Sequence, residues 1–405
     1  MHKLRVGVPI DRYDLHAGGA FSYATQLIAG INNHVFPNEI DIIFLDYTGK
    51  ANIESNKEFL SFHPYENSSF SDYFRKALIE MLKRSGKIFF NKFYNSLERK
   101  HSKKRNEIIK KILVKNDIHV ILYVKPDYVD VNFPFVTVHW DIGHRSTYMF
   151  PEFAESFESR EAYYHKVLNR ALYILTETQA GKNELINFTS INADRIGVMP
   201  IFPGGIINEN VPIDTQKNIL TRFNISENKF FIYPAQFWAH KNHIALIDAM
   251  REIIKLHPDV KLILTGSDKG NLGYIKDCIK EKNLNKNIQI VGFVSNEELF
   301  TFYKNAIALV MPTFLGPSNM PPLEAAFLDC PVILSDLNGH RELMKDYATY
   351  FDPTDVSDLH NKMLEHINSN KTETFNNSYF TIKNSVIALE AALLKLKPVR
   401  FTWGH

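Results

Sequence analysis

Residues that could bind a phosphate gather in the stretch GPSNMPPLE, residues 316–324. Its first four residues are typical of a turn, and Pro321 and Pro322 suit the first positions of a helix, where the missing N–H has no helical partner. A helix that begins behind such a loop presents unpaired N–H groups and a partial positive charge, which together attract phosphate. Glu324 is expected within the first turn, where its carboxylate either favours the helix dipole or accepts hydrogen bonds from the ribose of a bound nucleotide.

Further polar side chains come after two apolar runs that are typical of strands. His139, Asp141 and His144 come after residues 134–138, and Lys241 comes after residues 230–234. Open α/β sheets bind ligands beyond the carboxyl ends of their strands, so these side chains are candidates for a site. Two histidines and an aspartate could hold a metal ion, but a hydrogen-bonded loop is the stronger interpretation, and we expect no metal.

The stretch PPLEAAFLDCPVILSD resembles the donor-site signature of retaining GT-B glycosyltransferases of family 4, which reads EGFGLPxLEAMAxGxPV. Glu324 matches the second glutamate of that signature, and Gly316 stands where the first glutamate belongs. The resemblance implies that the loop from Gly316 to Met320 binds a nucleotide-sugar donor. It also implies that Ser318 and Asn319 make the polar contact to the sugar that the absent glutamate would make.

A second match, PAQFWAHKNH, resembles the GRLxxxKN passage of the same family. Lys241 falls on the lysine that pairs with the donor phosphate, a role that suits a compact ammonium group. Gln236 stands where arginine is usual, so one cation is absent from the implied site. Gly266 in LILTGS and Phe293 in VGFV lie in two further matching passages, and the backbone near Phe293 is implied to meet the nucleobase.

The amino-terminal half carries looser matches. VTVHWDIGHRSTYMFPEF resembles the VHDLxHxxxPEFF segment of the family, in which either His139 or Trp140 takes the usual histidine position. The resemblance implies catalytic roles for His139, Asp141 and Lys241. Gly18 and Gly19 follow the first predicted strand, where glycines let the backbone approach a ligand closely, and the resemblance implies that they face the donor phosphates.

Short apolar runs alternate with amphipathic helical patterns along most of the chain, which predicts doubly wound parallel sheets. The resemblance specifies a GT-B fold, in which two Rossmann-like domains face a central cleft. We expect the first domain to span residues 1–204 and to be completed by a helix within 376–405. The second domain is expected at 205–375, and residues 206–228 read as a polar bridge into it.

Composition indicates an ordinary globular protein of 405 residues with 45% hydrophobic residues. Cys278 and Cys330 are far apart and have no metal-ligand spacing, so neither a disulfide framework nor a zinc site is expected. The chain has no run of 18 apolar residues and no apolar signal-peptide core near its start. We therefore expect a cytoplasmic protein, with the inner face of the plasma membrane as a second location.

Positive charge concentrates in one segment. Residues 71–115 carry fourteen lysines and arginines against four acidic residues, within an insert expected at about 51–116. Apolar residues recur there at helical spacing, which predicts an amphipathic basic helix. The helix either packs its apolar face on its own domain or lies on an anionic membrane. The same charge could bind nucleic acid, but no nucleic-acid-binding fold surrounds it, and we expect no such partner.

The resemblance implies a retaining hexosyltransferase that works without a metal or another cofactor. Its donor would be a nucleotide-sugar, with GDP-mannose favoured over UDP-linked hexoses, and its acceptor a glycan or lipid-linked glycan of a bacterial surface polysaccharide. Two alternatives remain open. One is a sugar-nucleotide 2-epimerase, which uses a similar cleft, and the other is a non-catalytic sugar-nucleotide-binding subunit.

Overall fold

The structure is a computed structural model of the chain. It describes residues 3–10, 19–48, 55–62, 91–126, 131–368, 374–375 and 378–402, and for residues 91–101 it describes the backbone only. Gly18 and residues 71–90 of the basic segment lie outside the described residues.

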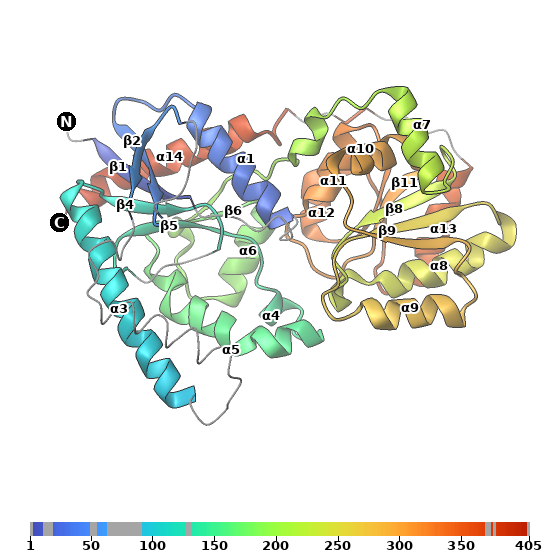
Figure 1. The fold of residues 1–405 in the computed structure, drawn as a ribbon, viewed down its shortest axis with the longest axis horizontal. Helices are drawn as coiled ribbons and strands as arrows, with labels where there is room; N and C mark the ends of the chain where they lie inside the picture. The colour runs from blue at the N-terminus through green and yellow to red at the C-terminus, as the bar shows by residue number, and fades with distance from the viewer. Residues whose placement is uncertain are drawn as a thin grey trace.

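The described chain forms two α/β domains that lie side by side, each built on a parallel sheet (Figure 1). The first sheet has the strand order β3-β2-β1-β4-β5-β6-β7 and the second has the order β10-β9-β8-β11-β12-β13. The strands of the first sheet are β1 (Leu4–Pro9), β2 (Ile40–Asp46), β3 (Glu58–Ser61), β4 (Val120–Tyr123), β5 (Phe135–His139), β6 (Tyr173–Thr176) and β7 (Ile196–Val198). Those of the second are β8 (Phe230–Pro234), β9 (Lys261–Thr265), β10 (Ile288–Gly292), β11 (Ala308–Met311), β12 (Val332–Ser335) and β13 (Thr349–Phe351).

Helices cover both sheets, and this confirms the predicted doubly wound architecture. In the amino-terminal domain they are α1 (Gly19–Asn33), α3 (Asn91–Lys115), α4 (Gly143–Ser146), α5 (Pro151–Lys166) and α6 (Gln179–Phe188). In the carboxyl-terminal domain they are α7 (Ile213–Arg222), α8 (His243–Leu256), α9 (Leu272–Glu281), α10 (Asn296–Asn305), α11 (Met320–Phe327), α12 (Asn338–Met344) and α13 (Val356–Ile367).

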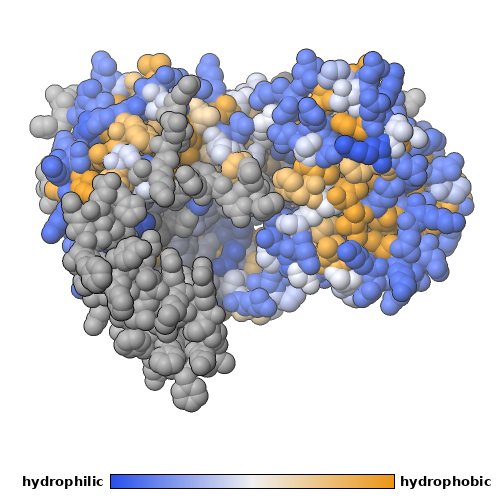
Figure 2. Space-filling view, in the orientation of Figure 1, coloured by the Kyte–Doolittle hydropathy of each residue, from blue (hydrophilic) through white to orange (hydrophobic). Residues whose placement is uncertain are grey.

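The central strands are buried along their whole length because helices pack on both faces. All four residues of β4 and of β11 are buried, as expected for continuous apolar runs in a parallel sheet. The helices bury one face each, and α8 does so through Leu246, Met250 and Ile253. In the view of Figure 2, hydrophilic residues form the outer rim of the carboxyl-terminal domain, and apolar residues gather toward its middle.

The last helix, α14 (Ile382–Arg400), returns to the amino-terminal domain and packs against α1. The Ser385 hydroxyl donates to the carbonyl of Pro200 at 2.6 Å, and the Arg400 Nε donates to the carbonyl of His119 at 2.8 Å. These bonds fasten the end of the chain to the domain that contains its beginning.

The interpretation of residues 206–228 as a polar bridge is wrong. This segment contains α7, whose Ile219 and Leu220 are buried, and Ile225 beyond the helix is buried as well. Its polar residues lie on the exposed face of an amphipathic helix, which explains why composition alone suggested a linker. Among the described residues, no helix is both long and apolar enough to cross a bilayer.

Candidate functional site

A cavity of about 860 Å³ lies between the two domains. The loops after β8 and β11 provide its wall on the carboxyl-terminal side, and these two strands are neighbours in the sheet although they are far apart in sequence. The wall of the amino-terminal domain comes from the start of α1, the loop after β5, the end of β6 and one face of α5. Both walls therefore lie at carboxyl ends of strands, where doubly wound sheets bind ligands.

The predicted phosphate-binding loop lies in this cavity. Gly316, Pro317, Ser318, Asn319 and Met320 all line it, and α11 begins at Met320. Pro321 and Pro322 occupy the next two helical positions, close to the predicted start. Because Pro321 and Pro322 have no N–H, the backbone donors available to an anion here are those of Met320 and of the loop before it.

Asn319 fills the space that a side chain at position 316 would need. A Cβ built on Gly316 would lie 1.8 Å from the Asn319 Nδ2. A glutamate at 316 is therefore incompatible with the observed position of Asn319. The departure from the family signature at Gly316 and the asparagine three residues later form one structural feature.

A directed chain of hydrogen bonds holds Asn319 and Lys241 together. Burial lowers the pKa of His340 to about 4, so its ring is neutral at pH 7. His340 Nδ1 lies 2.8 Å from the carbonyl of Ser335, to which it must donate, so Nε2 accepts from the Asn319 Nδ2 at 3.0 Å. The Asn319 Oδ1 is then turned toward the Lys241 Nζ, which donates to it at 3.3 Å.

Lys241 lines the cavity at the end of the loop that follows β8. Burial lowers the pKa of its ammonium group from 10.5 to about 8, and the nearby Asp141 acts in the opposite direction. The amine is therefore still mostly protonated at pH 7, although it has lost much of its hydration. A poorly hydrated cation beside Asn319, the residue that precedes α11, suits an arriving diphosphate.

Gln236 also lines the cavity, and its Oε1 accepts a hydrogen bond from the Trp238 Nε1 at 3.1 Å. The amino-terminal domain supplies a cation to the same space, since Arg160 of α5 lines it too. Arg160 donates to the Asp141 carboxylate, which also accepts from the Gly143 N–H at 2.9 Å. Burial raises the pKa of Asp141, but Arg160 and this N–H outweigh it, and the pKa lies below its ordinary value.

The structure places His139 and His144 in the interior of the amino-terminal domain rather than among the described residues that line the cavity. His139 Nε2 is 2.7 Å from the Tyr164 hydroxyl, and burial lowers its pKa to about 4. His144 pairs with Glu161 at 2.9 Å. Trp140, the other candidate for the family's histidine position, does line the cavity.

Glu324 is the fifth residue of α11 rather than part of its first turn. Its carboxylate accepts from the Tyr303 hydroxyl at 3.1 Å and from the backbone N–H of Gly204, and burial raises its pKa to about 7. The side chain faces the connection between the domains and is not among the described residues that line the cavity. Contact between Glu324 and a ribose therefore stays a prediction.

Four remaining candidates are glycines or lie beside one. Gly19 lines the cavity, whereas Gly18 lies outside the described residues. Gly266 has φ +143°, and a Cβ there would lie 2.3 Å from the carbonyl oxygen of Ala235, so glycine lets the end of β9 approach the cavity loop. Phe293 is 64% exposed, and its predicted proximity to a nucleobase stays a prediction.

Sequence reasoning missed Glu177, the residue directly after β6. It lines the cavity, is only 6% exposed, and accepts a hydrogen bond from the Ser318 hydroxyl of the opposite domain. The pKa of Glu177 is raised to about 8, chiefly by burial; the hydrogen bond from Ser318 opposes this rise, and the charge of Asp141 adds to it. The one available signal was a glutamate between two threonines, directly after an apolar strand.

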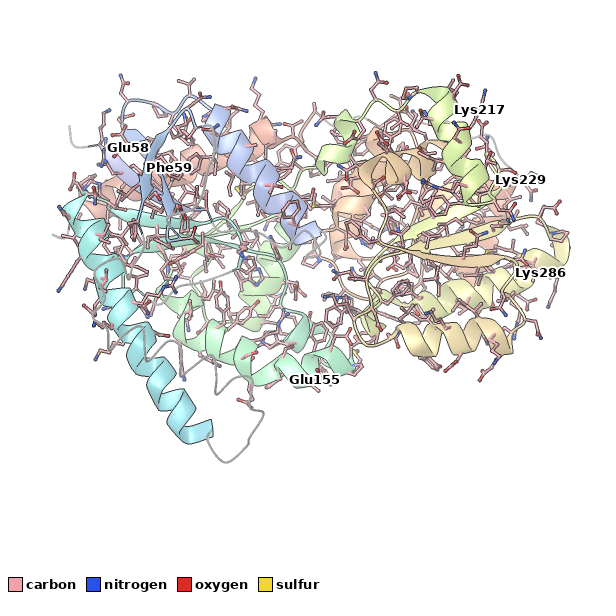
Figure 3. All side chains as sticks on the ribbon, in the orientation of Figure 1. Glu58, Phe59, Glu155, Lys217, Lys229 and Lys286 are labelled. Carbon is pink, nitrogen blue, oxygen red and sulfur yellow. The ribbon has the colours of Figure 1, made fainter. Side chains whose placement is uncertain are left out.

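The contribution of α5 was also missed. Its residues Glu152, Phe153, Ser156, Ser159 and Arg160 share one face and line the cavity. Glu155 lies at the end of α5 that is nearer to the carboxyl-terminal domain (Figure 3). The helix therefore presents hydroxyl and charged groups to the space opposite the phosphate-binding loop.

Side chains join the two domains around the cavity. The Glu152 carboxylate accepts from the His240 backbone N–H at 3.0 Å and lies 2.6 Å from the His240 Nδ1. On the other side, the Thr178 hydroxyl donates to the carbonyl of Pro317 at 2.6 Å. The Glu342 carboxylate accepts from two backbone N–H groups at the start of α6, each at 2.7 Å.

Among the described residues, no group of three or more histidines, cysteines, aspartates or glutamates is arranged to hold a metal ion.

The carboxyl-terminal domain is similar to known proteins. Residues 215–377 match the family model described as glycosyl transferases group 1. An uncharacterized glycosyltransferase of Methanocaldococcus jannaschii is 26% identical over 179 residues, which are 42% of this chain and 44% of that protein. The O-antigen chain mannosyltransferase B of Escherichia coli is 24% identical over 202 residues, which are 50% of this chain and 53% of that protein. The matches thus span about half the length of these relatives.

Solved structures share the fold of both domains. Sucrose-phosphate synthase of Thermosynechococcus elongatus has a TM-score of 0.64 at 17% identity and covers 99% of this chain and 99% of its own. HepE of Anabaena in complex with UDP-glucose has a TM-score of 0.59 at 13% identity and covers 98% of each chain. The chain therefore has the predicted GT-B fold, and its residues 215–377 match the model of the glycosyl transferases group 1.

Proposed function

We propose that the chain is a retaining glycosyltransferase of family 4 that moves a hexose from a nucleotide-sugar to a glycan or lipid-linked glycan. The observation that carries this proposal is the cavity between the domains. One wall combines the start of α11 with the ammonium group of Lys241, and the other presents the hydroxyl groups of Ser156 and Ser159 on α5. The first wall suits a diphosphate and the second suits a polyhydroxyl acceptor.

The proposed reaction is a front-face substitution. The bond from the anomeric carbon to the diphosphate oxygen breaks while the acceptor oxygen bonds to the same face of that carbon. The acceptor proton passes to the leaving diphosphate oxygen, and the configuration at the anomeric carbon is retained. Negative charge grows on the leaving diphosphate, and the backbone N–H groups of Ser318, Asn319 and Met320 stabilise it together with the Lys241 ammonium. Asn319 holds that ammonium in place through the chain of hydrogen bonds to His340 and Ser335. No metal is required for this step.

Mannose from GDP-mannose is the favoured donor, and bacterial surface polysaccharide is the favoured product. Two relatives support this choice, the O-antigen chain mannosyltransferase B of Escherichia coli and the O-antigen chain mannosyltransferase RfbU of Salmonella typhimurium. A structural neighbour, HepE, forms a complex with UDP-glucose, so UDP-hexoses belong in the same test.

The predicted place of work is the cytoplasmic face of the plasma membrane, where lipid-linked glycans would be reached. The support is the basic helix α3, on which Lys103 and Lys104 are exposed. Each cation near an anionic membrane contributes about 1 kcal/mol to binding.

The experiment is a transfer assay on the purified chain with GDP-mannose, UDP-glucose and dTDP-glucose, a panel of glycan acceptors, and chelator in the buffer. The expected result is transfer from GDP-mannose, with the product anomer identical to that of the donor by NMR. Epimerised donor formed without acceptor would instead identify a 2-epimerase. Binding without transfer or hydrolysis would identify a non-catalytic subunit.

A further inference from the structure

We propose that Glu177, a residue of the amino-terminal domain, binds a hydroxyl of the transferred sugar and so acts as a specificity-determining residue of the site. The inference rests on the proposed function. It concerns a carboxyl group that reaches the loop 316–320 from the opposite side of the cavity.

The first support is position. Ser318 donates a hydrogen bond to Glu177, and the next residue of the loop, Asn319, accepts one from Lys241. The carboxyl group and the ammonium group therefore contact adjacent residues of one loop. A donor whose diphosphate lies at Lys241 and the start of α11 would place its sugar in the space beside them.

The second support is that Gly316 leaves the loop without a carboxylate of its own. Asn319 occupies the space beside Gly316, so the loop cannot accept a longer side chain there without rearrangement. Glu177 is the acidic side chain that the described residues bring into contact with this loop across the cavity. Its second oxygen can pair with a sugar hydroxyl while the first remains bonded to Ser318.

The third support is rigidity. Glu177 lies between β6 and Thr178, and Thr178 both caps α6 and donates to the carbonyl of Pro317 at 2.6 Å. Two consecutive residues of one domain thus contact two consecutive residues of the other, and this fixes the position of the carboxyl group. Such fixed polar groups discriminate strongly between ligands that can and cannot pair with them.

Charge is consistent with this assignment. Glu177 faces Asp141 beyond β5, Tyr23 of α1 and Ser318, and its burial favours the neutral acid at pH 7. A neutral carboxyl group can both donate to and accept from a hydroxyl. It also avoids repelling the donor diphosphate nearby, which an ionised carboxylate would do.

The test compares binding of the nucleoside diphosphate alone with binding of the complete nucleotide-sugar by calorimetry. The probes are GDP with GDP-mannose and UDP with UDP-glucose, and the proteins are wild type, Glu177→Ala, Glu177→Asp and Glu177→Gln. Glu177→Ala is expected to weaken binding of the nucleotide-sugar about threefold to tenfold, the range of one hydrogen bond, and to leave binding of the diphosphate unchanged. Glu177→Asp, which shortens the reach, is expected to behave likewise, whereas Glu177→Gln keeps most of the affinity.

Glu184→Gln is the matched control. Glu184 belongs to the same region, and burial also raises the pKa of its carboxyl group, but it is not among the described residues that line the cavity. If Glu177 had only a structural role, Glu177→Ala would weaken binding of the diphosphate and of the nucleotide-sugar to the same extent, and this result would overturn the inference. An unchanged affinity for the nucleotide-sugar in both Glu177→Ala and Glu177→Asp would overturn it too, and so would a change confined to the acceptor KM.

The outcome is separable from that of the transfer assay. A chain that transfers no sugar, yet loses its preference for the nucleotide-sugar over the diphosphate in Glu177→Ala, contradicts the proposed function and supports the role of Glu177. A wild-type chain that binds both probes equally contradicts that role, whatever the transfer assay gives.

Discussion

Replacing Lys241 with methionine should stabilise the free protein and abolish most of its activity. Methionine keeps the length of the side chain but removes the charge. The fall of the Lys241 pKa from 10.5 to about 8 corresponds to about 3 kcal/mol, at roughly 1.4 kcal/mol for each pKa unit. The lost hydrogen bond to Asn319 costs about 1 kcal/mol, so we expect a net gain of about 2 kcal/mol in the free energy of unfolding at pH 7.

The pH dependence of this gain has a definite sign. The folded protein releases the Lys241 proton at a lower pH than the unfolded chain does, so wild-type stability recovers as the pH rises from about 8 toward 10.5. The advantage of Lys241→Met should therefore be complete below pH 8 and shrink above it. Although Lys241→Met gains stability, its kcat should fall by about 10²- to 10³-fold, because one donor to the leaving diphosphate is removed.

Urea unfolding at pH 7 and pH 10, together with the transfer assay, measures both effects. Lys286→Met is the matched control, since Lys286 is exposed on the side of the carboxyl-terminal domain away from the cavity, as are Lys217 and Lys229 (Figure 3). Wild-type kcat in Lys241→Met would refute the phosphate assignment. A loss of stability in this variant at pH 7 would refute the reasoning from burial.

Three further predictions concern other charged groups. Because the pKa of Glu177 rises from 4.5 to about 8 on folding, this group stabilises the fold fully below pH 4.5, and the stabilisation is lost as the pH rises through 8. The loss in the free energy of unfolding is no more than about 5 kcal/mol. Glu177→Gln should abolish it, as measured by urea unfolding at pH 5 and pH 8.5. Glu342→Gln should lower the free energy of unfolding by about 1–2 kcal/mol, because an amide cannot replace both hydrogen bonds to the start of α6, whereas the exposed Glu365→Gln should not. Neutralising three basic residues of α3 should weaken co-sedimentation with anionic liposomes, and unchanged binding would favour a helix that only packs on its own domain; these residues are Lys103, Lys104 and Arg105.

The sequence predicted the sheets well because their strands are short apolar runs with clear ends. Residues 134–138 and 230–234 were predicted as strands; β5 differs from the first range by one residue at each end, and β8 coincides with the second. Helix α5 went unrecognised because its sequence is mostly polar and only Phe153 and Tyr164 are buried along sixteen residues. A helix that lines a cavity buries little apolar surface, so its periodicity is weak.

The site was predictable where residues beyond a strand matched a family passage with an implied role in the site. Lys241, Asp141 and the loop at Ser318 all lie in the cavity because parallel strands bring their carboxyl ends to one edge. Glu177 was not predictable, since its importance comes from contact with a residue 141 positions away in another domain. Glu324 illustrates a different limit, because a motif places a residue on a helix but does not say which neighbour its side chain faces.

The bond between Ser385 and Pro200 bears on how the domains could move. The chain passes from the first domain to the second just beyond Pro200, and it is back on the first domain at α14, so both connections meet where Ser385 holds the Pro200 carbonyl. Two connecting segments that lie side by side at one point favour rotation of one domain relative to the other over a sliding movement. Substrate would then enter by a hinge rotation of the two domains about the contact between Ser385 and Pro200.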